Sequence, residues 1–196
     1  MQDFNPKVQE AVHRIQPRAM TEQAINWLRS EGFTSLNLDL IYGLPYQTSE
    51  DLRRTVEQCV EMKPDRVALF GYAHVPWVAS NQKMIPTEAL PDAPARFAQR
   101  GAVAEVLTGH GYEPTGLDHF AHPDDPLAIA ARNGHMRRNF QGYTIDQADA
   151  LLPFGVSSIG RLPQGFVGKH FPFDLEAFFG LRAQATVFIA DQQARP

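Results

Sequence analysis

The residue that most suggests chemistry is an acid, Asp39, near the end of an apolar, branched segment. The stretch 33–48 reads FTSLNLDLIYGLPYQT, and its apolar run breaks at Gly43-Leu44-Pro45. A carboxylate at the carboxyl end of a buried parallel strand is costly unless something is bound there. In barrel and open α/β folds, ligands bind at that end of the strands. The sequence therefore predicts that Asp39 belongs to a ligand site.

Polar or aromatic residues also follow the other expected strands. A single set of this kind is equally well explained by the capping of loops and helices. Four strand ends in succession favour a site, because a barrel gathers such residues on one rim. They are Gln2-Asp3, Asp39, Tyr72-Ala73-His74 and Asp118-His119.

The elements that must position these residues alternate between strand and helix. Strands recur every thirty to forty-five residues, which is the βαβ rhythm of a parallel sheet. Neither a G-x-G-x-x-G nor a G-x-x-x-x-G-K-[ST] motif occurs, so a portion of a (β/α) barrel fits better than a nucleotide-binding fold. We expect strands at 35–41, 67–70 and 112–117, and helices at 21–31, 49–62 and 92–110.

The composition is that of an ordinary globular protein. The chain has 196 residues, 43% of them hydrophobic and 20% charged, with a net charge of -4 and no block of Lys and Arg. This balance argues against a nucleic-acid or anionic-membrane surface. No apolar run approaches the length of a membrane span, and the start lacks a signal-peptide pattern, so we expect a cytoplasmic protein.

Three further segments carry groups that could bind something. His119 and His122 lie among aspartates, as metal ligands do, but Pro123 prevents a continuing helix and Asp124-Asp125 can cap the next one; we prefer the capping interpretation. The stretch 137–144 combines arginines, amides and aromatic rings, which suits carboxylates and flat ligands but equally an exposed basic loop. The stretch 151–160 is either a last barrel strand close to a ligand or a plain core strand.

The single cysteine, Cys59, limits the chemistry further. It excludes a disulfide framework and a cysteine metal site within this chain. It lies on the apolar face of its expected helix, where an inert buried thiol is expected rather than a nucleophile.

Taken together, these stretches resemble the oxygen-independent coproporphyrinogen III oxidases, radical S-adenosylmethionine enzymes of haem biosynthesis. The resemblance runs in order from Gln2 to about Val167. LDLIYGLP is shared with related radical enzymes, including a haem-chaperone branch, whereas QDFN, YAHVPW and RNFQGYT are more specific. The full set is QDFN at 2–5, LDLIYGLPYQT at 38–48, DRVALFGYAHVPW at 65–77, GLDHFAHPDD at 116–125, RRNFQGYT at 137–144 and GVSSIG at 155–160.

The resemblance implies a reaction and its cofactors. The family oxidatively decarboxylates propionate side chains of coproporphyrinogen III to vinyl groups, giving protoporphyrinogen IX. It uses a [4Fe–4S] cluster and S-adenosylmethionine, whose radical abstracts a propionate hydrogen. We therefore expect a porphyrinogen substrate, no nucleic-acid partner and a monomeric parent enzyme; the sequence does not identify the electron donor or acceptor.

The resemblance also assigns site residues. Gln2, Arg14 and Asp39 fall on positions that contact the cluster-bound S-adenosylmethionine. Their chemistry agrees, since a carboxylate can accept from ribose hydroxyls or an ammonium group and a guanidinium can pair with a carboxylate. No acid–base residue is assigned, because the reactive species belongs to the cofactor. Positions lining a second such site correspond to Ala73, Gln141 and Ile159.

Two departures from the family lead to the expectation of an incomplete enzyme. The cluster motif C-x-x-x-C-x-x-C lies upstream of the matched region, and one cysteine cannot replace the thiolates that a cluster needs. The tail at 168–196 does not look like the family; a frame shift in the source sequence is favoured over a divergent helix at 174–188. We expect a partial radical-SAM-type barrel at 1–167 that is inactive alone. The alternative function is a non-catalytic haem-binding or haem-chaperone protein on the same barrel.

Overall fold

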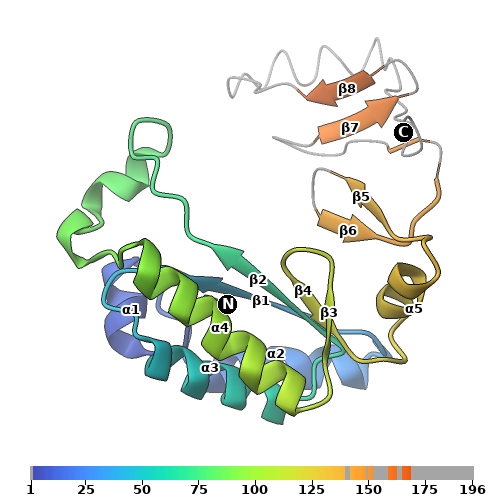
Figure 1. Cartoon of the computed structure of the whole chain (residues 1–196), viewed down its shortest axis with the longest axis horizontal. Helices are drawn as coiled ribbons and strands as arrows, with labels where there is room; N and C mark the ends of the chain where they lie inside the picture. The colour runs from blue at the N-terminus through green and yellow to red at the C-terminus, as the bar shows by residue number, and fades with distance from the viewer. Residues whose placement is uncertain (1, 140–141, 149, 152–158, 163–164, 169–196) are drawn as a thin grey trace. The chain divides into compact units, whose positions relative to one another are not determined.

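A computed structural model describes residues 2–139, 142–148, 150–151, 159–162 and 165–168 (Figure 1). The chain divides into two compact units, Met1–His135 and Met136–Pro196. In the first unit the elements are α1 (Pro6–Ala11), α2 (Arg18–Ser30), β1 (Asn37–Tyr42), α3 (Ser49–Glu61), β2 (Arg66–Gly71), the 3-10 turns η1 (Ser80–Met84) and η2 (Thr87–Ala89), α4 (Ala93–Gly109), β3 (Glu113–Thr115), β4 (His119–Ala121) and α5 (Pro126–Arg132). The second unit contains β5 (Arg137–Asn139), β6 (Gly142–Thr144), β7 (Ile159–Leu162) and β8 (Gly165–Gly168).

The βαβ unit β1–α3–β2 confirms the central expectation. Thr48 and Asp51 form a capping box, in which the Thr48 hydroxyl accepts from the Asp51 amide at 3.1 Å and the Asp51 carboxylate accepts from the Thr48 amide at 3.3 Å. The helix then buries Leu52, Val56 and Cys59 at helical spacing. Strands β1 and β2 pair in parallel from Asn37↔Arg66 to Tyr42↔Gly71.

The remainder of the sheet corrects the expectation of a third parallel strand at 112–117. The four-stranded sheet has the order β1-β2-β4-β3, with β4 antiparallel to both of its neighbours. The physical reason is a tight turn at residues 116–118, where Gly116 has a φ of 70° and reverses the chain after three strand residues. Within the described residues β1 and β3 are therefore edge strands, and no barrel closure is seen.

The core lies between the sheet and helices α2, α3 and α4, which lie on one side of it (Figure 1). Leu38 and Leu40 of β1, Val67 and Leu69 of β2 and Phe120 of β4 point into this core. Alternate residues of a strand point to opposite faces. The other face of the sheet consequently carries the residues between them. Helix α5 packs against β3, where Arg132 and Glu113 form an ion pair at 2.5 Å.

Helix α2 differs at its start from the expected helix at 21–31. It begins at Arg18, directly after Pro17, and Thr21 is a buried residue inside it rather than its cap. Arg18 stabilises the earlier first turn by ion pairs with Glu22 at 2.7 Å and Glu61 at 2.8 Å. The end of the helix is as expected, because Gly32 adopts a φ of 88°.

The second unit consists of two antiparallel hairpins in its described part, β5–β6 and β7–β8. Because β5 and β6 pair antiparallel, the stretch 137–144 is a hairpin rather than an open loop. Within it Arg138 stacks over the Tyr143 ring at 5.1 Å. Strand β7 pairs antiparallel with β8, which is not the parallel partner expected of a last barrel strand; residues 152–158 lie outside the described residues. The boundary at residue 167 stays a prediction, and the tail from 169 also lies outside the described residues.

Candidate functional site

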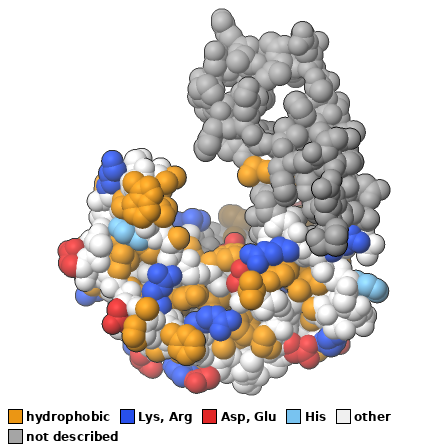
Figure 2. Space-filling model, turned by 45° about the horizontal axis from the view of Figure 1, so that its top comes forward, with side chains coloured by type: hydrophobic (Ala, Val, Ile, Leu, Met, Phe, Trp, Pro, Cys, Tyr) orange, Lys and Arg blue, Asp and Glu red, His pale blue; other side chains and the backbone are white. Residues whose placement is uncertain are grey.

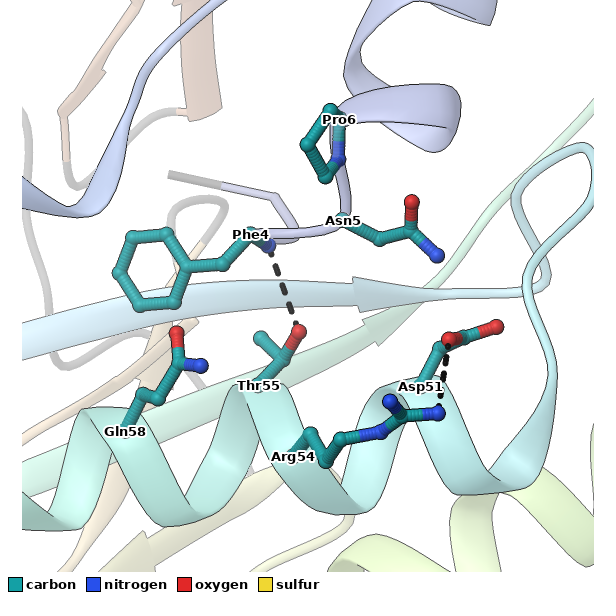
Figure 3. A pocket seen from close by; sticks show the side chains of 7 residues that line it. All are labelled: Phe4, Asn5, Pro6, Asp51, Arg54, Thr55 and Gln58. Carbon is teal, nitrogen blue, oxygen red and sulfur yellow. Dashed lines mark hydrogen bonds and ion pairs between the residues drawn. The ribbon is translucent and has the colours of Figure 1, made fainter.

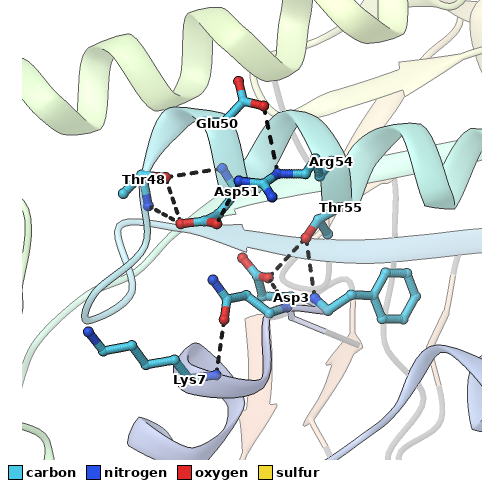
Figure 4. Close-up of polar contacts among 9 residues, drawn as sticks. Asp3, Lys7, Thr48, Glu50, Asp51, Arg54 and Thr55 are labelled. Atoms are coloured by element: carbon cyan, nitrogen blue, oxygen red, sulfur yellow. Dashed lines mark hydrogen bonds and ion pairs between the residues drawn. The ribbon is translucent and has the colours of Figure 1, made fainter.

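The segment before α1 is held to α3 and to the turn after β1 by a buried carboxylate. Asp3 is 1% exposed and accepts hydrogen bonds from Gln47 Nε2 at 2.5 Å and from the Asn5 amide at 2.6 Å. It also accepts from Thr55 Oγ1 at 2.9 Å (Figure 4). Burial raises the pKa of this carboxyl above its ordinary value. The preceding residue, Gln2, accepts from the Ile41 amide at 3.1 Å through its carbonyl. Asp3 therefore positions Gln2 beside the carboxyl end of β1.

A second buried amide shapes the loop that carries Arg14. Gln9 is 5% exposed, and its Nε2 donates to the Asp3 carbonyl at 2.7 Å and to the Gln16 carbonyl at 2.8 Å. Its Oε1 accepts from the Gln16 amide at 2.9 Å. Arg14 lies in the loop that these bonds between Gln9 and Gln16 close, and its side chain is exposed. The Arg14 loop is thus tied to the same segment that carries Gln2.

The turn after β1 depends on two further glutamines. Gln47 Nε2 donates to the Ile41 carbonyl at 2.9 Å, and its Oε1 accepts from the Leu44 amide at 3.1 Å. Gln99 of α4 reaches the same turn, accepting from the Gly43 amide at 3.0 Å and donating to the Gln47 carbonyl at 2.6 Å. Gly43 has a φ of 84°, a conformation that favours glycine. The turn is therefore fixed by side chains rather than by a ladder of strands.

Asp39 does not lie where the sequence argument placed it. It is the third of six residues in β1, and it is exposed between the buried Leu38 and Leu40. The premise of a strand buried on both faces was wrong for the described structure, because helices cover only one face of β1. The Asp39 carboxylate accepts from Asn37 Nδ2 at 2.7 Å and projects from the face opposite the core.

Ala73 lies two residues after the end of β2 and is exposed. Its carbonyl accepts from Gln82 Nε2 at 3.1 Å, and Gln82 Oε1 accepts from the Val75 amide at 2.5 Å. Tyr72 Oη contacts His74 Nδ1 at 3.0 Å, so the loop is braced on both sides of Ala73. Gln82 thus fixes the backbone of this predicted site residue, a role that no motif in the sequence indicated.

The other predicted residues belong to the second unit. Ile159 begins β7 and is 38% exposed, and it pairs with Gly168 across the hairpin. Gln141 lies outside the described residues. The structure therefore has Asp39 in β1, Gln2 hydrogen-bonded to Ile41 of the same strand, and Arg14 on the loop after α1.

The two histidines of the segment 118–125 make contacts typical of a structural role. His119 Nδ1 contacts Asp118 Oδ1 at 2.7 Å, and the His122 ring lies against Tyr112 with centroids 4.1 Å apart. Asp125 caps α5 by accepting from the Leu127 amide at 2.7 Å, as expected. Within the described residues no group of three or more His, Cys, Asp or Glu side chains is arranged to hold a metal ion. Asp118 also lies beside β2, because its carbonyl accepts from the Leu69 amide at 2.6 Å.

A cavity of about 270 Å³ lies between the N-terminal segment and α3 (Figure 3). It is lined by polar groups of α3, including Asp51, Arg54 and Gln58, and by Asn5 and Phe4 from the other side. Arg54 pairs with Asp51 and with Glu50, each at 3.6 Å. Of these groups Asp51 and Arg54 line the cavity, so its lining carries one acidic and one basic side chain that pair with each other.

The glutamines that organise this region were not predicted from the sequence. Asp3 lies within the QDFN motif and Gln47 within LDLIYGLPYQT, but nothing in their residue types predicts that their side chains bond to each other. Gln99 had a detectable signal, since it shares the helical spacing of Val103 and Val106 and therefore faces the core. A polar residue at a core position indicates a buried partner.

Comparison with known proteins gives the ancestry of this mixed α/β unit with a partial parallel sheet. The matching relatives are oxygen-independent coproporphyrinogen III oxidases. That of Paracoccus denitrificans is 47% identical over 166 residues, covering 85% of this chain and 37% of the relative. That of Bradyrhizobium diazoefficiens is 50% identical over 167 residues, with the same coverage. That of a Synechocystis strain is 46% identical over 179 residues, covering 91% of this chain and 38% of the relative. No protein-family profile matches the chain.

A solved structure supports the same relationship. The coproporphyrinogen III oxidase of Escherichia coli, a radical SAM enzyme, superposes with a TM-score of 0.86 at 37% identity, covering 100% of this chain and 45% of that one. The chain is therefore a homologue of the oxygen-independent coproporphyrinogen III oxidases, and it spans about 37% of the length of the relatives named above. No helix of the described residues is long and apolar enough to cross a membrane.

Proposed function

We propose that this chain forms part of an oxygen-independent coproporphyrinogen III oxidase and contributes one wall of its S-adenosylmethionine site. The observation that carries the proposal is the identity of 47% over 166 residues with such an enzyme, in one collinear match. Because the chain spans only part of these relatives, the oxidative decarboxylation itself is proposed for a completed protein. We expect the chain alone to be inactive.

The geometry supports a role for Asp39 and Gln2 toward the cofactor. Asp39 offers an exposed carboxylate on the face of the sheet opposite the core, and Gln2 is held next to Ile41 of the same strand. These groups suit the hydroxyl and ammonium donors of S-adenosylmethionine, and the Arg14 guanidinium suits its carboxylate. When bound to a reduced cluster, the cofactor supplies hydrogen-abstracting radical chemistry. Ala73, Gln141 and Ile159 remain proposed as lining residues of a second site.

The cluster itself does not fit the residues of this chain. Cys59 is fully buried on α3, and burial raises the pKa of its thiol to about 12. A cluster ligand must be a thiolate, and several are needed. We infer that the cluster ligands come from outside this sequence.

A chimera tests the proposal. The matching 166-residue segment of the Paracoccus denitrificans relative is replaced by the corresponding residues of this chain, and anaerobic conversion of coproporphyrinogen III to protoporphyrinogen IX is measured. We expect activity, and a loss of about tenfold or more on Asp39→Asn because a charge-assisted hydrogen bond to the cofactor is removed. The matched control is Asp124→Asn, an exposed aspartate before α5.

The contrary results are equally clear. An inactive but folded chimera would count against the proposed function. Haem binding by the chimera that S-adenosylmethionine does not affect would instead favour the haem-chaperone alternative.

A further inference from the structure

A second cavity, of about 370 Å³, lies between the end of β1 and the first turns of α4. Its walls combine two guanidinium groups, Arg96 and Arg100, with two aromatic rings, Tyr42 and Phe97; Pro91 and Ala93 complete the lining. None of the proposed cofactor residues belongs to it. The cavity therefore needs an explanation separate from the cofactor wall.

Arg96 is inserted between the two strand ends. Its NH2 donates to the Tyr72 carbonyl at 2.7 Å, and its guanidinium lies 5.8 Å from the centre of the Tyr42 ring. A Cβ at Gly71 would meet Tyr42 Oη at 2.9 Å and Arg96 at 3.2 Å, and a Cβ at Gly43 would meet Arg96 Nε at 3.0 Å. The absence of side chains at these two glycines makes the space that this arginine occupies.

Arg100 supplies a second positive charge one helical turn further along α4. Its NH2 donates to the Leu117 carbonyl at 3.1 Å, which ties α4 to the turn between β3 and β4. Like charges at positions i and i+4 of a helix repel one another. The lining of the cavity includes no Asp or Glu to offset them. A guanidinium has five N–H donors, and each of these arginines uses one NH2 group in the hydrogen bond to a carbonyl.

The aromatic groups indicate the rest of the ligand. Phe97 lines the cavity and is 79% exposed, so its ring is accessible to a ligand. Figure 2 shows Lys and Arg side chains interspersed with hydrophobic ones on the visible face of the described residues. Guanidinium groups recognise carboxylates, and aromatic rings recognise flat bodies.

We propose that Arg96, Arg100, Tyr42 and Phe97 form a binding site for a planar organic anion, and that its occupant is a carboxylate-bearing ring of the porphyrinogen substrate. The identity of the occupant rests on the proposed function, whereas the anion site rests on the cavity alone. A volume of 370 Å³ suits part of such a molecule rather than all of it, so one pyrrole ring and its acidic side chain would enter.

The test is a binding titration of the full chain with coproporphyrin III, a stable fluorescent tetracarboxylate. Arg100→Gln and Phe97→Ser are the informative variants, because both side chains are exposed and their loss leaves the core intact. We expect each to weaken binding about tenfold or more. Arg54→Gln is the matched control, removing an exposed arginine from α3 with little effect on the Kd. Circular dichroism melts verify that every variant is folded.

Two ligand arms identify the source of the anion. We expect a water-soluble porphyrin with cationic side arms not to bind, and AMP, which carries a planar adenine and a phosphate, to compete only weakly. Tighter binding of AMP than of coproporphyrin would overturn the porphyrin assignment. No binding by the wild-type chain, or equal binding by Arg100→Gln, would overturn the site.

The same variants in the chimera separate this proposal from the proposed function. An active chimera whose KM for coproporphyrinogen is unchanged by Arg100→Gln would leave the proposed function standing and remove the anion site. Retained, arginine-dependent coproporphyrin binding by a chimera without activity would do the reverse.

Discussion

At the scale of single residues, Asp3 places a carboxylate where water hardly reaches it. All three of its described partners donate hydrogen bonds to it, so the ionised group is satisfied by geometry while burial opposes its charge. Asp3→Asn sets one amide NH2 against the donors of Gln47, Thr55 or Asn5. We expect the free energy of unfolding at neutral pH to fall by about 1–3 kcal/mol, measured by urea denaturation.

The difference in stability between the wild type and Asp3→Asn should depend on pH, because the pKa of Asp3 is raised in the folded state. A carboxyl whose pKa is higher in the folded state binds its proton more tightly there, so its contribution to stability is full below the ordinary value of 3.8. That contribution is lost as the pH rises through the folded pKa. The stability of the wild type minus that of Asp3→Asn should therefore decrease from about pH 3.5 upward and become constant above the folded pKa. An increase with pH would contradict the assignment; Asp124→Asn serves as the exposed control.

What the sequence could predict at this scale is shown by Asp39. Its alternation with Leu38 and Leu40 was sufficient to place it on a strand. Which face of that strand is covered depends on where α2, α3 and α4 pack, and this is decided by residues distant in the sequence. The expectation of a buried acid failed for this reason.

At the scale of elements, the Gln99 side chain joins α4 to the turn after β1 by hydrogen bonds. Gln99 is 1% exposed and satisfies both the Gly43 amide and the Gln47 carbonyl. Gln99→Leu leaves two buried backbone groups without partners, so we expect a loss of about 2–4 kcal/mol in the free energy of unfolding. Hydrogen exchange should also accelerate more at the Gly43 amide than at the amides of the preceding strand, β1.

The matched control for this prediction is Gln23→Leu, the same substitution at an exposed position of α2. It should change the free energy of unfolding by no more than about 0.5 kcal/mol. Similar losses for both variants, or unaltered exchange at Gly43, would show that Gln99 does not hold the turn.

Elements with strong local signals were predictable and short ones were not. The start of α3 is predicted by Thr48 with Asp51, and the start of α4 by Asp92 before Pro94. The structure has caps at both places. Strands β3 and β4 have three residues each, too few for a periodic pattern to reveal the reversal at Gly116. The antiparallel insertion between β2 and β3 could be found only in three dimensions.

At the scale of the whole molecule, the described sheet ends in an edge strand with little protection. β1 is the outermost strand beside β2, and at Ile41 its backbone amide donates to the Gln2 carbonyl rather than to another strand. Large apolar side chains such as Trp27, Phe33 and Trp77 are exposed at 57–77%. Unpaired strand edges and exposed apolar surface both favour association.

We therefore expect the isolated chain to associate with increasing concentration in sedimentation velocity experiments. Asn37→Lys adds a charge at the exposed start of β1 and should shift the chain toward monomer, because lysine on an edge strand opposes pairing with another chain. Asn26→Lys, on the exposed side of α2, adds the same charge away from the edge and should change sedimentation little. If the wild-type chain sediments as a single monomer with a sharp cooperative melt, the edge is stable as it stands. The homologous segment would then be an autonomous folding unit rather than a part that requires completion.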